Sequence, residues 1–260
     1  MADTHEDEYD DGMVAMLELI WGEGFLAPGG SENVRRIVAG LDLRDKTVLD
    51  IGSGVGGVDL ILAEEYGARV IGFEIEPALI TRARDYAARS GLSEQIEFRH
   101  VEPGPLQLDD ACIDVVFSSG AIIHIDDKQE LFKDIIRVLR PGGALAVYDW
   151  LKGPDPYSDD MRYWFEMEGL TYAMDTLENY ERMLHEAGFV DIQSSDSSAW
   201  YRRHAREEYT RMKGELHEQM VAALGKDRAE NFVENWRAST IVLDNGELRT
   251  CRFCAHKPGA

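Results

Sequence analysis

The sequence predicts an α/β protein built around a mostly parallel β-sheet. Between residues 46 and 150, short apolar runs of strand length alternate with segments of helical spacing. Strands that are separated by helices pair in parallel through right-handed crossovers. A glycine-rich turn, VLDIGSGVGG at Val48–Gly57, follows the first of these strands. Ligands of open α/β sheets bind beside such turns, so the functional site is expected there.

The first 45 residues are predicted to be helical. Apolar residues recur at helical spacing from Met13 to Trp21, and the residues FLAPGG at 25–30 interrupt this pattern. Ser31 is a residue type that caps helix N-termini, so a second helix is expected over 32–41 with Ser31 as its cap.

The middle of the chain contains five expected strands and three expected helices. The strands are short and apolar, and one helix begins at Pro77, a residue that suits the first helical turn. The strands are expected at 46–52, 68–75, 95–100, 113–119 and 143–150, and the helices at 57–67, 77–91 and 127–140.

After Trp150 the chain becomes mainly helical and rich in aromatic residues. An aromatic helical stretch covers 159–174, and an amphipathic helix over 176–189 precedes a strand at 190–197. A long polar helical stretch from 200 to 243 then leads to a final strand at 247–257.

Composition excludes several classes of function. The formal net charge of −22 would repel nucleic-acid phosphates. No apolar run reaches the ~20 residues of a membrane span, and the acidic N-terminus is unlike a secretory signal. The spacing Cys251-x-x-Cys254 places the two thiols on opposite faces of a strand, so no metal site is predicted. We expect a cytoplasmic protein.

The glycine turn fits two kinds of adenosine-bearing cofactor. Gly52, Gly54 and Gly57 match a dinucleotide-binding turn, and Glu74 follows at the end of the next strand. However, Asp50 stands two residues before Gly52, where its charge would oppose a pyrophosphate. A carboxylate at this place suits the cationic amino and sulfonium groups of S-adenosylmethionine, which favours that cofactor over NAD.

The same stretch resembles the first motif of S-adenosylmethionine-dependent methyltransferases of class I, which have a seven-stranded Rossmann-like sheet. The family motif D/E-x-G-x-G-x-G corresponds to Asp50, Gly52, Gly54 and Gly56. The resemblance continues from Lys46 to Trp150 as an ordered series of motifs. It implies that Glu74 holds the ribose hydroxyls and that Ile75 and Glu102 lie beside the adenine. The full set of implied cofactor-binding residues is Asp50, Gly52, Ser53, Gly54, Gly56, Glu74, Ile75, Glu102, Pro103 and Ser118.

The N-terminal segment resembles that of phosphoethanolamine methyltransferases, which methylate an amine nitrogen. This resemblance implies that Tyr9 and His124 form a catalytic pair over the reacting atom and that the N-terminal arm closes as a lid. The chain also departs from that family. It has Ser119 and Gly120 where the family has Arg-Asp, Trp150 for a Tyr and Leu170 for an Arg, which implies a different small substrate.

We therefore expect a small-molecule methyltransferase, with an amine nitrogen as the acceptor. Methyl transfer to oxygen, sulfur or carbon is the first alternative. An NAD-dependent oxidoreductase and a catalytically silent cofactor binder are further alternatives. Residues 1–45 are expected to form the lid, 46–150 the cofactor-binding core, and 151–260 the substrate-facing helices and final strands of the same domain.

Aromatic residues after the core are expected to wall the substrate pocket, since aromatic faces attract a methylated ammonium group. The side chains predicted to contact the substrate are those of Trp150, Trp164 and Tyr172, with Tyr163 and Trp200 as further candidates. An anionic group of the substrate would be held by an arginine, for which Arg162, Arg202 and Arg203 are candidates.

Overall fold

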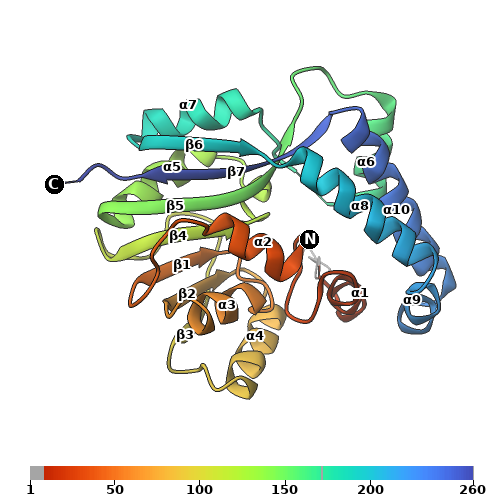
Figure 1. The fold of residues 1–260 in the computed structure, drawn as a ribbon, viewed down its shortest axis with the longest axis horizontal. Coiled ribbons are helices and arrows are strands. Elements are labelled where there is room, and N and C mark those ends of the chain that lie inside the picture. Colours follow the sequence, from red (N-terminus) through yellow and green to blue (C-terminus); the bar gives the residue numbers. More distant parts are fainter. Residues whose placement is uncertain (1–8, 171, 260) are drawn as a thin grey trace, which may run out of the picture.

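The computed structural model describes residues 9–170 and 172–259, and Figure 1 shows how their helices and strands are arranged. Within these residues the strands form one seven-stranded sheet of order β3-β2-β1-β4-β5-β7-β6. Six of these strands, β1–β6, run in the same direction, and β7 runs antiparallel to its neighbours β5 and β6. The predicted fold class is confirmed. The strands are β1 Thr47–Ile51, β2 Arg69–Glu74, β3 Ile96–His100, β4 Ile113–Ser119, β5 Leu139–Lys152, β6 Val190–Asp196 and β7 Leu248–His256.

Helices cover both faces of the sheet because both sides of its strands are apolar. Consecutive residues of β1 alternate in direction, so Val48 packs into one core and Leu49 into the other. The core around Val48 is closed by α2, α3 and α4, and the core around Leu49 by α5 and α7. These helices are α2 Gly30–Ile37, α3 Gly57–Glu64, α4 Pro77–Arg89, α5 Lys128–Val138 and α7 Leu177–Ala187.

The remaining helices gather on one side of the sheet, at the right of Figure 1. Glu208, which is buried, joins three of them because the indole N–H groups of Trp21 and Trp236 donate to its two carboxylate oxygens at 2.8 and 3.0 Å. This links the N-terminal helix α1 to helices that follow it by nearly two hundred residues. The helices are α1 Asp11–Trp21, α6 Asp159–Glu168, α8 Ser198–Lys213, α9 His217–Leu224 and α10 Lys226–Asp244.

The predicted cap of the second helix was wrong. Helix α2 begins at Gly30 with Gly29 as its N-cap residue in the left-handed region, so Ser31 lies inside the first turn. The Ser31 hydroxyl accepts a hydrogen bond from Arg35 at 3.0 Å instead. A side chain at position 29 would collide with the Trp200 ring, 2.3 Å from an ideal Cβ. Packing of a distant helix therefore overrides the local capping preference.

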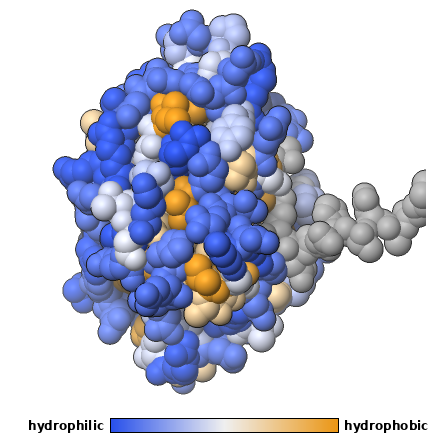
Figure 2. All heavy atoms as spheres, turned by 90° about the vertical axis from the view of Figure 1, so that its right-hand side faces the viewer, coloured by the Kyte–Doolittle hydropathy of each residue, from blue (hydrophilic) through white to orange (hydrophobic). Residues whose placement is uncertain are grey.

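The outer surface of the helical side is mostly hydrophilic, with hydrophobic residues in separate small areas (Figure 2). None of the helices in the described parts of the chain combines the length and apolar character that a bilayer crossing demands.

Gly57 brings the segment after α1 against the first turn of α3. Its N–H donates to the Gly24 carbonyl at 2.9 Å, and an added Cβ would lie 2.2 Å from that oxygen. We expect Gly57→Ala to lower the free energy of unfolding by roughly 1–3 kcal/mol, the usual effect of overpacking. Urea denaturation measures this change. Gly259→Ala is the control, because no atom lies within 4 Å of its added Cβ; equal losses in both variants would contradict the contact.

Candidate active site

The glycine turn forms a tight loop between β1 and α3. Gly52, Gly54 and Gly56 all have positive φ angles, of 80°, 55° and 89°. An added Cβ at Gly52 would lie 2.3 Å from the Ala121 side chain, so only glycine fits between the loop and the segment after β4. The N–H groups of Gly52 and Ser53 donate to the Phe73 carbonyl at 2.9 and 3.0 Å. The loop is thereby fixed to the end of β2.

Glu74 ends β2 and holds the loop from the other side. Its buried carboxylate accepts hydrogen bonds from the N–H groups of Gly54 at 2.8 Å, Ile75 at 2.8 Å and Glu76 at 3.0 Å. An ionised carboxylate has about four acceptor positions. Three are used by backbone, which leaves about one for a ligand hydroxyl.

Two further carboxylates lie beneath the loop. Asp50 and Asp59 are 1% and 0% exposed, and neither carboxylate accepts a hydrogen bond from another described residue. Burial raises the pKa of both carboxyls; the charge of Glu74 adds to the effect at Asp50, and that of Asp50 adds to it at Asp59. Within residues 9–170 and 172–259, no group of three or more acidic, histidine or cysteine side chains is arranged to hold a metal ion.

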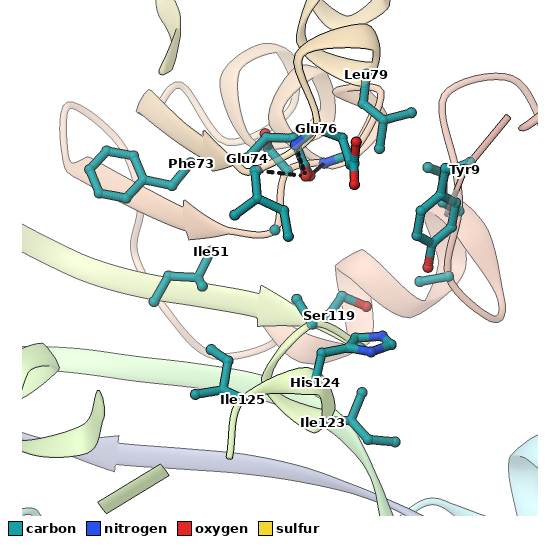
Figure 3. Close-up of a pocket in the computed structure, with 18 of the residues that line it drawn as sticks. Tyr9, Ile51, Phe73, Glu74, Glu76, Leu79, Ser119, Ile123, His124 and Ile125 are labelled. Carbon is teal, nitrogen blue, oxygen red and sulfur yellow. Dashed lines mark hydrogen bonds between the residues drawn. The ribbon is translucent and has the colours of Figure 1, made fainter. Parts of the chain in front are cut away.

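A cavity of about 1020 Å³ extends from this loop to the helical side. Its volume is at the upper end of the range for small-molecule sites, ~300–1,000 Å³. Figure 3 shows Glu74 and Glu76 at one part of its wall, with the Ile75 N–H bonded to Glu74. The predicted cofactor residues that line it are Gly52, Ser53, Gly54, Glu74, Ile75, Glu102 and Pro103.

Three predicted cofactor residues stand behind the wall rather than in it. They are Asp50, Gly56 and Ser118, none of which is among the lining residues. The Ser118 hydroxyl donates to the Ile51 carbonyl at 2.9 Å, which joins β4 to the end of β1. By contrast, the Ile75 side chain lies in the wall and is 49% exposed, as expected of an apolar face offered to a flat ring.

The predicted pair Tyr9 and His124 both line the cavity. Figure 3 shows them extending into it from the segment before α1 and from the short 3-10 helix η1, Ile122–His124. Asp10, the residue after Tyr9, caps the N-terminus of α1 and forms an ion pair with Arg228 of α10 at 2.8 Å. These two interactions fix the position of the chain next to Tyr9. Residues 1–8 of the predicted lid, which spans residues 1–45, lie outside the described residues.

Aromatic side chains surround His124. Its ring centroid lies 5.2 Å from that of Tyr172, whose ring is 6.0 Å from Trp150. Trp150 and Tyr172 line the cavity, as the predicted substrate contacts should. Trp164 does not line it, being 0% exposed behind the Tyr172 ring with its indole N–H donating to Ser239. The further candidates Tyr163 and Trp200 are also absent from the wall.

A buried polar network supports the segment that carries His124. The Lys128 ammonium donates to the carbonyls of Ile125 at 2.7 Å and Ala173 at 2.6 Å. Burial lowers the pKa of Lys128, and the charge of Asp149 acts in the opposite direction by raising it. The Tyr180 hydroxyl donates to the Asp149 carboxylate, and both are fully buried. Through the Ala173 carbonyl, this network joins η1 to the irregular segment that bears Tyr172, so it sets the relative positions of the two rings.

Sequence reasoning missed Asp59, Lys128, Asp149 and Glu168. An acidic residue in the first turn of a helix, as Asp59 is, ordinarily serves the helix dipole and gives no separate signal. Lys128 and Asp149 are 21 positions apart, one in α5 and the other in β5. Only the fold brings their charges close enough to interact. The one available signal was Asp149 at the end of a strand in VYDW, which follows the same pattern as Asp50.

The comparisons with known proteins agree with this geometry. Residues 49–147 match the family of methyltransferase domains. Phosphoethanolamine N-methyltransferase 3 of Arabidopsis thaliana is 28% identical over 251 residues, which cover 96% of this chain and 50% of that protein. The chain thus spans about half the length of the curated relatives it matches.

Two solved structures have the same fold. Phosphoethanolamine N-methyltransferase 2 of Haemonchus contortus, in complex with phosphomonomethylethanolamine and S-adenosylhomocysteine, superposes with a TM-score of 0.90 at 24% identity, covering 97% of this chain and 59% of that one. A candidate sarcosine dimethylglycine methyltransferase of Galdieria sulphuraria gives a TM-score of 0.84 at 18% identity, covering 97% and 99%.

Residues 49–147 thus match the methyltransferase-domain family, and the chain has the fold of class I methyltransferases. Within the class, the chain is related to the phosphoethanolamine N-methyltransferases. The resemblance inferred from the sequence motifs is confirmed.

The raised pKa of the buried Asp149 carboxyl predicts that the free energy of unfolding depends on pH. Burial raises the pKa of its carboxyl from 3.8 to about 6, so the folded protein binds this proton more tightly than the unfolded chain does. The resulting stabilisation is complete below pH ~4 and is lost as the pH rises through ~6, by about 3 kcal/mol. Asp149→Asn removes the titrating group, so we expect its unfolding free energy to fall less than that of the wild type over this range. Parallel pH profiles from urea denaturation would contradict the prediction.

Proposed function

We propose that this protein is an S-adenosylmethionine-dependent methyltransferase that acts on the amine nitrogen of a small molecule. The observation that carries the proposal is the set of buried carboxylates Asp50, Asp59 and Glu74 around the glycine loop, at one end of a cavity that also contains His124. A pyrophosphate would be repelled by Glu74, and it would oppose ionisation of Asp50 and Asp59, whose pKa values burial already raises. A methyl donor with an ammonium and a sulfonium group would be attracted.

The residues of the loop fit this donor. The backbone of Gly52–Gly54 would hold its amino-acid portion, with Asp50 acting through its charge from behind the wall, and the remaining acceptor position of Glu74 would take a ribose hydroxyl. Ile75 and Glu102 would flank the adenine. When bound, the donor supplies a methyl group on a positively charged sulfur.

At the other end of the cavity, His124 would act as general base. An amine is mostly protonated at pH 7 and must lose a proton before it can attack carbon. Histidine has an ordinary pKa near 6.5, which suits this transfer. The Tyr172 ring packs against His124, and Lys128 fixes the segment on which His124 stands. Tyr9 would orient the acceptor and cover it from water.

The names of the relatives support an amine acceptor. The Arabidopsis and Haemonchus proteins are phosphoethanolamine methyltransferases, and the Galdieria protein is assigned to sarcosine and dimethylglycine. All three acceptors are amines, and their anionic groups differ. The nitrogen is therefore the shared element that we carry over to this chain.

His124→Ala tests the proposal. We expect the turnover number to fall by roughly 100- to 10,000-fold, the usual contribution of a general base, with binding of S-adenosylhomocysteine unchanged. The measurement is formation of S-adenosylhomocysteine with a panel of small amines. Gln129→Ala, on the adjacent helix, is the control. A His124→Ala variant with full activity would exclude the role as base, and a wild type inactive on every amine would exclude the proposed acceptor.

A further inference from the structure

Beyond His124 the cavity continues into a region that we call the substrate chamber. Its wall is mainly aromatic, and the rings contact one another in series: Trp150 lies 6.0 Å from Tyr172 and 5.8 Å from Tyr201, centroid to centroid. Helices α1 and α10 close it through Trp21 and Trp236, whose centroids are 5.8 Å apart. The chamber is lined by Tyr9, Trp21, His124, Trp150, Glu168, Leu170, Tyr172, Tyr201, Phe232 and Trp236.

One acidic side chain, Glu168, belongs to this wall. Asn235 donates to its carboxylate at 2.8 Å, and the Tyr172 hydroxyl is a second hydrogen-bond partner. Burial raises the pKa of this carboxyl. Glu168 is also the last residue of α6, where the negative end of the helix dipole disfavours a carboxylate. Neither helix stability nor solvation therefore explains an acidic residue here, whereas a cationic ligand would.

The described wall of the chamber contains no lysine or arginine. Among the lining residues of the cavity as a whole there are one lysine and one arginine, Lys133 and Arg137 of α5. Both are paired with carboxylates. Arg137 also donates to the Leu106 carbonyl, at the cofactor end near Glu102. The arginines considered from the sequence as anion partners, Arg162, Arg202 and Arg203, are not part of the wall.

We infer that Glu168 is a specificity-determining residue that binds the substrate ammonium group, and that the substrate is a small amine without a phosphate group. This inference rests on the proposed function and narrows its substrate class. The aromatic rings would surround the methylated nitrogen, and the Glu168 carboxylate would supply the opposite charge. A phosphate would be buried beside a carboxylate with no cation to pair with it.

Binding of quaternary ammonium ions tests this directly, because their charge does not depend on pH and they accept no further methyl group. We expect the complex with S-adenosylhomocysteine to bind choline at least tenfold more tightly than phosphocholine in isothermal titration calorimetry. Equal or tighter binding of phosphocholine would overturn the inference. This comparison uses wild-type protein only, so it does not depend on the folding of any variant.

The variant Glu168→Gln keeps the shape of the side chain and an oxygen for Asn235 while removing the charge. We expect it to weaken binding of the preferred ammonium ion about tenfold and to leave S-adenosylhomocysteine binding unchanged. Glu166→Gln, an exposed position on the same helix, is the matched control. An unchanged affinity in Glu168→Gln would exclude the assigned role.

Turnover separates failure of this inference from failure of the proposed function. Methylation of sarcosine, dimethylglycine or ethanolamine in preference to phosphoethanolamine supports both. Methylation of phosphoethanolamine in preference to unphosphorylated amines leaves the methyltransferase function standing and overturns the inference. Absence of S-adenosylhomocysteine binding overturns the proposed function itself.

Discussion

The site depends on the hydrogen bonds that the Glu74 carboxylate accepts from the backbone of Gly54, Ile75 and Glu76. These bonds connect the glycine loop after β1 to the turn after β2, so the two strand ends share one rigid edge. Charge-assisted hydrogen bonds of this kind are about twice as strong as neutral ones. The buried carboxyls of Asp50 and Asp59 lie beneath the same edge, and neither has a hydrogen-bond partner among the described residues. Together with Glu74 they form an acidic cradle, in which we propose that a positively charged ligand favours ionisation of the two buried carboxyls.

The helical side of the molecule converts this cradle into an enclosed site. Glu208 ties α1 to α8 and α10, and the pairing of Asp10 with Arg228 fixes the chain next to Tyr9. The Lys128 ammonium donates to the Ile125 carbonyl, next to His124, and interacts with the charge of Asp149. In the proposed function, the parallel sheet edge selects the cofactor and the helical cover holds the acceptor. Such a division allows the substrate chamber to change while the cradle is retained.

Much of the fold was predictable because local pattern and tertiary structure agree in the sheet. The alternation of apolar runs and helices identified every strand, and the acidic strand ends at Asp50 and Glu74 indicated the cofactor edge. Prediction failed where distant packing decides the outcome. Ser31 did not become a helix cap because the Trp200 ring occupies the space at Gly29. Trp164 was expected at the substrate and is instead packed behind Tyr172, since the helix phase of α6 directs it into the core. Glu168 gave no signal at all, because only the fold brings it beside Tyr172 and Asn235.

The central claim, that buried carboxylates select a cationic adenosine ligand, is tested most directly by calorimetric titration of the wild type and Asp50→Asn with S-adenosylhomocysteine and with NADH. The account predicts that the wild type binds S-adenosylhomocysteine and not NADH. It also predicts that Asp50→Asn weakens S-adenosylhomocysteine binding roughly tenfold, because the variant loses the carboxyl charge that would act on the ligand ammonium group from behind the cavity wall. Binding of NADH by the wild type, or undiminished affinity in Asp50→Asn, would contradict it.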